Sequence, residues 1–386
     1  MRIHSRAAVL TTALATAVAG LVMAGPAAAH PYHAPRTVYV AASAAGQHGH
    51  WCRHAGFTDI QAAIGAVADG GTVVVCRGTY HGMFTITHRM TLAGRPGAVI
   101  DATGMPYGVG TSASWVTIRG LTVQNASPLD PSSNAPADGI LTAGLTDHGP
   151  VTANHVRIIG NTVKGNLGSG IDLNSTSYSM AVGNRAVGNG VGINVSDDLG
   201  LPAAHNLVSG NVTNENFGGC GIALADHTGA GVIGNVVTFN RSDDNGLSTP
   251  TAPDASAGSG VILASPIPNG LVRNNTIAWN EFHGNGHGGV VVHSHVPALP
   301  DGTASDFRGN SVIGNVIGTN NLRQDQSDPE TTGIYLGSAT PLTIKVAYNL
   351  IHDDHYGIFT AGDVTVTGGH NRFVRVAQHH GGVASY

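Results

Sequence analysis

Residues 182–198 read VGNRAVGNGVGINVSDD. The stretch holds one Gly-Asn pair at Asn184, a second at Asn189, and then a segment that begins Gly-Ile and alternates apolar and polar residues. Glycine and asparagine accept the left-handed backbone geometry of tight turns, and a period of two is typical of a strand. The stretch therefore predicts short strands separated by turns, and it ends on two adjacent carboxylates, Asp197 and Asp198.

This unit repeats along most of the chain. An asparagine is followed five residues later by a second one, and then comes a strand beginning Gly-Ile or Gly-Val, which recurs every 22 to 44 residues. Such a period indicates a solenoid, in which turn asparagines of successive coils stack and pair the buried polar groups of the backbone. We expect Asn161, Asn184, Asn211 and Asn235 to form one ladder. The pairs are Asn161/Asn166, Asn184/Asn189, Asn211/Asn216, Asn235/Asn240, Asn275/Asn280, Asn315/Asn320 and the degenerate Asn349/Asp354.

Residues 57–80, FTDIQAAIGAVADGGTVVVCRGTY, follow a different pattern. They predict an amphipathic helix over 58–69 and then a buried strand. Together with the repeats, this segment resembles the right-handed parallel β-helix proteins of the pectate-lyase-like superfamily. The resemblance implies an all-β solenoid, a right-handed parallel β-helix, whose N-terminal α-helix caps the open end. It also implies a single domain over 30–386, with coils over about 71–380.

The first 29 residues have the order of a secretory signal peptide. Arg2 and Arg6 precede an apolar stretch that ends in Ala27-Ala28-Ala29. We therefore expect cleavage after residue 29 and a secreted, extracellular protein without a membrane span. The chain carries 18 Lys and Arg against 23 Asp and Glu, which argues against a nucleic-acid partner. We also expect a monomer.

The chain has three cysteines, an odd number for an exported protein. Cys52 and Cys76 lie in the N-terminal region, and we predict a disulfide between them. Closing a loop of this size stabilises a protein by about 3 kcal/mol in the chain-entropy model. Cys220 lies between glycines in an apolar strand pattern, so we expect a buried free thiol.

Acidic residues gather on three neighbouring coils. Long connections at 126–138, 241–259 and 321–332 leave from the same turn, so they would wall a groove above these coils. Paired carboxylates suit cleavage of a glycosidic bond, in which one protonates the leaving oxygen and the other activates water or attacks. The catalytic candidates are Asp172, Asp197, Asp198, Asp226 and His227, and outward Asn194 is a substrate-binding candidate.

Two other interpretations of the acidic coils stay open. Carboxylate oxygens suit Ca²⁺, which could bridge an acidic sugar, so Ca²⁺ is a candidate cofactor although none is certain. The other interpretation is a solvated strand end without a ligand. The polygalacturonases of the superfamily carry an Asp-Asp pair and a Gly-His-Gly in nearby coils. Here Asp197-Asp198 and Gly286-His287-Gly288 are several coils apart, so those catalytic roles are not carried over.

Histidine and aromatic residues supply two weaker candidate sites. His283, His287, His293 and His295 offer zinc-like spacing, although turn histidines without a metal are the alternative. Tyr335 and Phe359 take outward positions on consecutive strands. Stacked rings could bind sugar faces as substrate-binding residues, or they could pack beneath the C-terminal tail.

The leading hypothesis is an exported β-helix protein that binds a polysaccharide or cell-wall glycan along a lateral groove. It would process that glycan as a hydrolase, lyase or epimerase. The alternative is a cell-surface or adhesion solenoid without catalysis. Substrate and reaction type are not encoded in any motif of this sequence.

Overall fold

The computed structural model describes residues 34–43, 51–128, 136–146, 149–247, 258–324 and 330–383. The chain divides into Met1–His33 and Ala34–Tyr386. The first unit includes the predicted signal peptide and lies outside the described residues. Among the described residues, no helix is long and apolar enough to cross a membrane.

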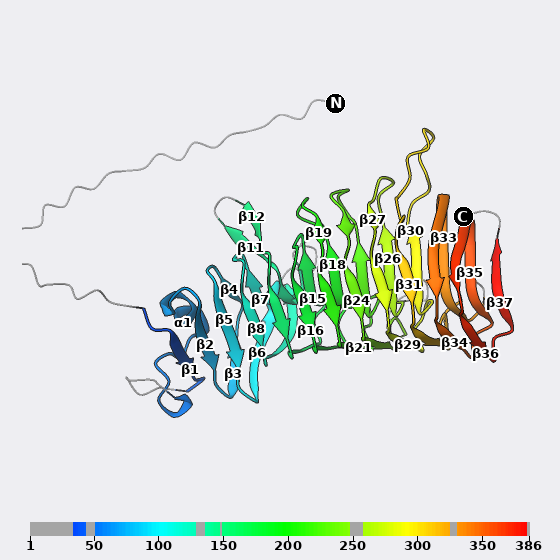
Figure 1. Ribbon diagram of the computed structural model, residues 1–386. Helices are drawn as coiled ribbons and strands as arrows, with labels where there is room; N and C mark the ends of the chain where they lie inside the picture. Colours follow the sequence, from blue (N-terminus) through cyan, green and yellow to red (C-terminus); the bar gives the residue numbers. More distant parts are fainter. Residues whose placement is uncertain are drawn as a thin grey trace, which may run out of the picture. The chain divides into compact units, whose positions relative to one another are not determined.

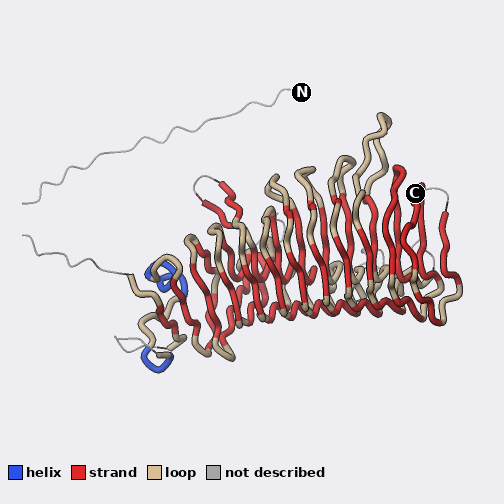
Figure 2. Tube along the Cα trace, in the orientation of Figure 1, coloured by secondary structure: helices blue, strands red, loops and turns tan. Residues whose placement is uncertain are grey.

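Ala34–Tyr386 folds as a right-handed parallel β-helix, which confirms the predicted fold class. Coil follows coil along the axis, and Figures 1 and 2 show the strands of successive coils side by side. Each full coil contributes strands to three parallel faces, which we call face 1, face 2 and face 3. The strands that begin Gly-Ile or Gly-Val lie on face 1.

The strands of the three faces pair in parallel from coil to coil. Face 1 contains β4 (Phe84–Ile86), β7 (Tyr107–Thr111), β10 (Asp138–Leu141), β15 (Ser169–Asn174), β18 (Val191–Ser196), β22 (Ile222–Ala225), β26 (Val261–Ser265), β30 (Val290–Ser294), β33 (Thr332–Ala347), β35 (Tyr356–Gly369) and β37 (Gln378–Val383). Face 2 contains β1 (Thr37–Val40), β2 (Gly71–Val75), β5 (Met90–Gly94), β8 (Thr117–Arg119), β13 (Arg157–Ile159), β16 (Met180–Val182), β20 (Leu207–Ser209), β24 (Val236–Thr238), β28 (Thr276–Ala278) and β31 (Ser311–Ile313). Face 3 contains β3 (Gly78–His81), β6 (Ala98–Gly104), β9 (Thr122–Pro128), β14 (Thr162–Lys164), β17 (Arg185–Val187), β21 (Val212–Asn214), β25 (Arg241–Asp243), β29 (Glu281–His283), β32 (Val316–Gly318), β34 (Leu350–His352) and β36 (Arg372–Val374).

Two features join or decorate these faces. β33 and β35 are long enough to continue from face 1 into face 2, so the corner between the faces disappears in the last coils. Short strands outside the faces form an antiparallel hairpin and a small parallel sheet. They are β11 (Ala143–Thr146) with β12 (Gly149–Thr152), and β19 (Ala203–Ala204), β23 (Val232–Ile233) and β27 (Val272–Arg273).

The N-terminal helix α1 spans Ile60–Ala66, within the predicted range of 58–69. It begins there because the side chain of Asp59 accepts a hydrogen bond from the Ala62 N–H at 2.6 Å, a typical N-cap contact. Ile60 and Ile64 are buried against the first strands. The strand β1 precedes the helix and pairs with β2, so parallel pairing starts before residue 71.

The core consists of columns of identical inward positions. On face 1 Ile140, Ile171, Ile193 and Ile222 pair in register and are fully buried. Adjacent strands lie ~4.8 Å apart, so each side chain packs on its counterpart in the next coil. One coil alone would leave this apolar face exposed, and stacking buries it.

The asparagine ladders are real, but the predicted membership of one was wrong. Asn184 Nδ2 donates to Asn211 Oδ1 at 3.0 Å, and Asn211 Nδ2 donates to Asn240 Oδ1 at 2.9 Å. Asn235 instead accepts from Asn206, in a third ladder at the corner between faces 1 and 2. From Asn206 onward the coils carry asparagines at three corners, so the sequence spacing alone does not separate the ladders. The ladders are Asn161–Asn184–Asn211–Asn240–Asn280–Asn315–Asn349–Asn371, Asn166–Asn189–Asn216–Asn245–Asn285–Asn320–Asp354 and Asn206–Asn235–Asn275–Asn310.

The backbone explains why glycine precedes these asparagines. Gly183 and Gly188, which lie directly before Asn184 and Asn189, have φ of 64° and 66°. This left-handed region costs glycine nothing, whereas a side chain adds strain. The Gly-Asn pair is therefore one corner of the coil, with a left-handed residue followed by a buried ladder residue.

The predicted disulfide is present. Cys52 and Cys76 are bonded, with 5.6 Å between their Cα atoms, and they attach the loop that contains a short 3-10 helix (Cys52–His54) to the end of β2. Cys220 is a buried free thiol, also as predicted.

Candidate functional site

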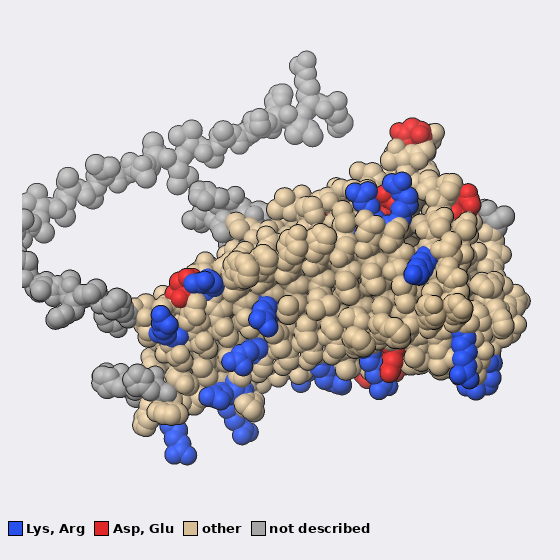
Figure 3. Space-filling model, viewed as in Figure 1, with Lys and Arg blue, Asp and Glu red and all other residues tan. Residues whose placement is uncertain are grey.

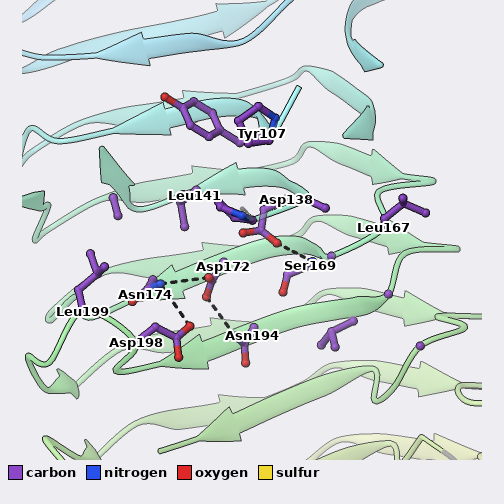
Figure 4. Close-up of a pocket in the computed structure, with 18 residues that line it drawn as sticks. Tyr107, Asp138, Leu141, Leu167, Ser169, Asp172, Asn174, Asn194, Asp198 and Leu199 are labelled. Atoms are coloured by element: carbon purple, nitrogen blue, oxygen red, sulfur yellow. Dashed lines mark hydrogen bonds between the residues drawn. The ribbon is translucent and has the colours of Figure 1, made fainter. Parts of the chain in front are cut away.

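A pocket of about 860 Å³ opens on face 1 above β7, β10, β15 and β18. It lies on outward positions of these strands, beside the long connection that ends at Asp138. Figure 4 shows its polar groups on neighbouring strands. The lining residues are Pro106, Tyr107, Pro136, Ala137, Asp138, Leu141, Ala143, Leu167, Gly168, Ser169, Asp172, Asn174, Gly190, Val191, Asn194, Asp198, Leu199 and Gly218.

Three carboxyl groups from consecutive coils line this pocket: Asp138 on β10, Asp172 on β15 and Asp198 just after β18. Asp138 and Asp172 are buried, with 5% and 4% of each residue exposed. The Asp198 side chain keeps 37% of its surface exposed at the rim. The pocket therefore places two desolvated carboxyls beside one that solvent can reach (Figure 4).

Shared hydrogen-bond donors join Asp172 to Asp198. Ser196 Oγ lies 3.3 Å from Asp172 Oδ1 and 3.0 Å from Asp198 Oδ2. Asn174 Nδ2 lies 3.4 Å from an oxygen of each. Ser196 has a single hydroxyl proton, so it donates fully to one carboxylate at a time unless one of the two carboxyls is itself protonated and donates to Ser196.

Burial controls the ionisation of the two inner carboxyls. It raises the pKa of Asp172 well above the ordinary range, and the neighbouring Asp138 and Asp198 raise it further. Burial likewise raises the pKa of Asp138 to about 7, an effect that Asp198 increases and the Ser169 N–H partly offsets. Removing charge from water disfavours the ionised form, and like charges add to that penalty. A proton is therefore retained in the pocket near neutral pH.

Two asparagines complete the polar floor. The predicted substrate-binding residue Asn194 lines the pocket, and its Nδ2 donates to Asp172 Oδ1 at 3.2 Å. Asn174 is 7% exposed, and its Oδ1 is buried without a hydrogen-bond partner. Unpartnered buried acceptors are rare in folded proteins because they lose their hydration without compensation. Asn174 Oδ1 is thus positioned to accept a hydrogen bond from a ligand.

The predicted candidates Asp197 and Asp226 point away from the pocket. Asp197 is fully buried and accepts hydrogen bonds from Thr228 Oγ1 at 2.6 Å and from the backbone of His227, Ala230 and Gly231. Burial would raise the pKa of Asp197, but these donors lower it below its ordinary value. Its carboxylate anchors the turn at 227–231.

Asp226 is also fully buried and fixes the neighbouring turn. It accepts from the Gly229 N–H at 2.7 Å and from the Leu271 N–H at 2.9 Å. Burial raises the pKa of Asp226, and these two N–H groups partly offset the rise. Neither Asp197 nor Asp226 is among the residues that line the pocket.

His227 contacts the pocket only through Asp198. Its Nδ1 is hydrogen-bonded to Asp198 Oδ1, and this contact raises the pKa of His227. Asp197, Asp198 and His227 place one ligand atom each within 4.8 Å of one another, so the group could hold a metal ion. The surroundings of Asp197 do not fit Ca²⁺. Both of its carboxylate oxygens already accept hydrogen bonds from N–H and O–H groups. The remaining pair, one carboxylate and one histidine, is a poor set of ligands for a hard cation.

The aromatic candidates lie far along the same face. Tyr335 and Phe359 stack with 5.9 Å between ring centroids, and they are only 6% and 2% exposed. They belong to a small apolar cluster with Cys220, Ile262 and Val291. Neither ring presents an open face to solvent, which agrees with the packing alternative.

The histidines considered for zinc divide between two faces. His293 and His295 lie together at the end of β30 on face 1, with ring centroids 4.5 Å apart. His283 lies on β29 of face 3, where its Nδ1 is 3.3 Å from Asp243 Oδ1. Within the part of the chain that the structure describes, they do not form a metal-binding group with His287.

Sequence reasoning missed Asp138. The residue directly precedes Gly139-Ile140, so DGIL at 138–141 is one more copy of the Gly-Ile strand. The copy was hidden because its turn asparagines are absent and the long connection 126–138 interrupts the repeat. Alignment of Gly139-Ile140 with Gly170-Ile171 would have revealed it, since Ile140 pairs with Ile171 and Asp138 then lies at the start of a face 1 strand.

The fold is shared with several solved structures. Pectate lyase Pel9A aligns with a TM-score of 0.57 and 17% identity, over 88% of this chain and 80% of that one. An alginate lyase from Paenibacillus sp. str. FPU-7 aligns with a TM-score of 0.54 and 18% identity, over 90% and 99% of the two chains. PfbA, a surface adhesin of Streptococcus pneumoniae, aligns with a TM-score of 0.52 and 14% identity, over 83% and 87%. No family model and no curated protein matches the chain by sequence. At these identities the comparisons show a common fold, which hosts both enzymes and an adhesin.

Proposed function

We propose that this protein is a secreted carbohydrate-active enzyme that hydrolyses a glycosidic bond in the face 1 pocket. One observation carries the proposal: Asp138, Asp172 and Asp198 come from consecutive coils and line a single pocket. A structural role would favour carboxylates held by backbone donors, as Asp197 is. The pocket carboxyls instead lie beside one another, where burial and like charge raise the pKa of two of them.

The chemistry needs one proton donor and one proton acceptor. In our proposal Asp172 donates its proton to the leaving glycosidic oxygen as the bond to the anomeric carbon breaks. Asp198 takes a proton from a water molecule whose oxygen bonds to that carbon, so that both protons are accounted for. Asp138 keeps the proton on Asp172 through its negative charge when ionised, and His227 positions the Asp198 carboxylate through Nδ1.

The cellular setting follows from the N-terminus and the disulfide. The predicted signal peptide over 1–29 would export the chain, and the Cys52–Cys76 disulfide is consistent with an extracellular location. The partner would then be an extracellular polysaccharide or a cell-wall glycan. No step of this proposal uses a metal, and Ca²⁺ binding stays a separate prediction that calorimetric titration of the metal alone can test.

The decisive experiment uses residues 30–386 and a panel of polysaccharides, with and without added Ca²⁺. Hydrolysis releases reducing ends without ultraviolet absorbance, whereas a lyase also creates an absorbing unsaturated product. We expect reducing ends alone, and we expect the Asp172→Asn variant to lose them. The matched control is Asp363→Asn, an exposed carboxyl on β35. Full activity of Asp172→Asn would contradict the role that we assign to Asp172, and no turnover of any glycan by the parent protein would favour the adhesion alternative.

A further inference from the structure

We infer that the face 1 pocket selects an uncharged sugar residue and rejects uronic acids. The inference rests on the proposed function in one respect, that this pocket is where the glycan binds. It separates the protein from the pectate lyase and the alginate lyase that share its fold, because pectate and alginate are acidic polysaccharides.

The lining of the pocket contains acidic residues and no basic ones. Asp138, Asp172 and Asp198 line it, and none of its lining residues is Lys, Arg or His. A bound uronate would place a fourth carboxyl among these three without a basic lining residue to pair with it, since His227 outside the lining is already paired with Asp198. An ionised carboxyl of the lining repels a bound carboxylate, and a protonated one offers it no compensating positive charge.

The segments outside the described residues cannot supply the missing lysine or arginine. Apart from Met1–His33, they are 44–50, 129–135, 147–148, 248–257, 325–329 and 384–386, and the sequence of each contains no Lys or Arg. The chain has 18 Lys and Arg, of which Arg2 and Arg6 fall in the predicted signal peptide. The other 16 are all described, and no member of that set lines the pocket.

The polar groups of the pocket include acceptors that suit a ligand with hydrogen-bond donors. Asn174 lines the pocket, and its buried Oδ1 has no hydrogen-bond partner, so a donor from a ligand would satisfy it. A sugar hydroxyl supplies that donor, whereas a carboxylate has only acceptor oxygens. Asp198 presents a second acceptor at the rim. The polar floor of the pocket therefore matches hydroxyl groups.

The walls fit the rest of a neutral sugar. Tyr107, Leu141 and Leu199 line the pocket around the carboxyls. Apolar and aromatic side chains can cover the C–H surface of a sugar ring, while a few polar groups fix its orientation. Burial raises the pKa of Asp138 and of Asp172, which favours their neutral forms and weakens the attraction for cationic amino sugars.

Binding is measured by calorimetry with the Asp172→Asn variant, in which turnover is expected to be slow. The probes are tetrasaccharides of glucose, xylose and mannose, against tetrasaccharides of galacturonate, mannuronate and glucosamine. We expect a neutral tetrasaccharide to bind at least tenfold more tightly than any uronate. The Asn174→Leu variant should weaken that binding about tenfold, since it removes the unpartnered acceptor.

A charge substitution provides a second readout. Leu199→Arg adds a cation at the rim of the pocket, so it should strengthen uronate binding about tenfold and leave the neutral ligand less affected. Leu201→Arg is the matched control, because Leu201 is exposed and does not line the pocket. Equal gains in both variants would indicate a general charge effect and would contradict the inference.

The outcomes separate this inference from the proposed function. Hydrolysis of a uronate polymer that is lost in Asp172→Asn would uphold the function and overturn the inference. Tight binding of a neutral tetrasaccharide without turnover in the parent protein would uphold the inference and overturn the proposed function. Preference for the glucosamine probe, or no binding of any probe, would overturn the inference as well.

Discussion

The carboxylate of Asp138 accepts a hydrogen bond from the backbone N–H of Ser169 at 2.7 Å, between two neighbouring coils. One such bond does not replace the water that an ionised carboxylate loses on burial, and burial raises the pKa of Asp138 to about 7. The folded protein therefore retains a proton that the unfolded chain releases near its ordinary pKa of about 3.9. A measurable dependence of stability on pH follows.

The free energy of unfolding should fall as pH rises from about 4 to about 7. In this window the native state binds more protons at Asp138 than the unfolded state, so the linkage slope is negative. The Asp138→Asn variant keeps a similar shape without the charge. Its free energy of unfolding should equal that of the parent protein near pH 4. Near pH 8 it should be higher than that of the parent protein, by a few kcal/mol at most.

Denaturant unfolding of both proteins across this pH range tests the prediction. Asp363→Asn serves as the control, because its exposed side chain should change stability by less than about 0.5 kcal/mol at either pH. If the free energy of unfolding of Asp138→Asn and of the parent protein changed in parallel with pH, burial would not raise the pKa of Asp138 as we infer.

Asp172 and Asp197 should respond differently to the same substitution. Asp172→Asn should lower turnover by about 10²–10⁴-fold, since it removes the proton donor, and should leave the fold at least as stable near pH 7. Asp197→Asn should lower the stability by about 1–3 kcal/mol, because its new NH₂ group faces the N–H donors of Ala230 and Gly231. Turnover numbers and melting temperatures of the two variants give the comparison. If Asp197→Asn abolished turnover in a fully stable protein, the role that we assign to Asp197 would be wrong.

Interrupting an asparagine ladder should lower the stability of the protein. Asn211 Nδ2 donates to Ala181 O and to Asn240 Oδ1, both at 2.9 Å, and its own Oδ1 accepts from Asn184. Asn211→Leu leaves these buried groups unpaired, so we expect a loss of at least about 1–3 kcal/mol. Asn269→Leu is the exposed control and should change stability little. An equal effect of the two variants in urea unfolding would argue against the ladder.

The Cys52–Cys76 disulfide should stabilise the protein, and the Cys220 thiol should stay shielded in the native state. Cys52→Ser/Cys76→Ser should lower the free energy of unfolding by about 3 kcal/mol, because the loop is no longer closed in the unfolded chain. Alkylation of the native protein without reductant should label no cysteine, since Cys220 is buried, and should label Cys220 alone after unfolding. Labelling of Cys52 or Cys76 under either condition would contradict the bond.

The sequence by itself determined the fold of this protein because the fold is local and repetitive. Most corners from Asn161 onward are a left-handed residue followed by a buried asparagine, as at Gly183-Asn184, and most face 1 strands begin Gly-Ile or Gly-Val. Repetition also predicted the Ile171–Ile193–Ile222 column. It could not assign Asn235 to its ladder, because a coil with asparagines at three corners offers several registers with the same spacing.

The site was decided only by the tertiary structure. The sequence indicated Asp172, Asn194 and Asp198, because an outward position in a strand and a position just past its end are local properties. The exclusion of Asp197 and Asp226 from the pocket depends on turns at 227–231 and 269–271, whose N–H groups turn toward those carboxylates. The presence of Asp138 depends on register across a long connection, and its raised pKa depends on burial by residues from several coils. Packing between coils sets these two properties, and no short stretch of sequence contains them.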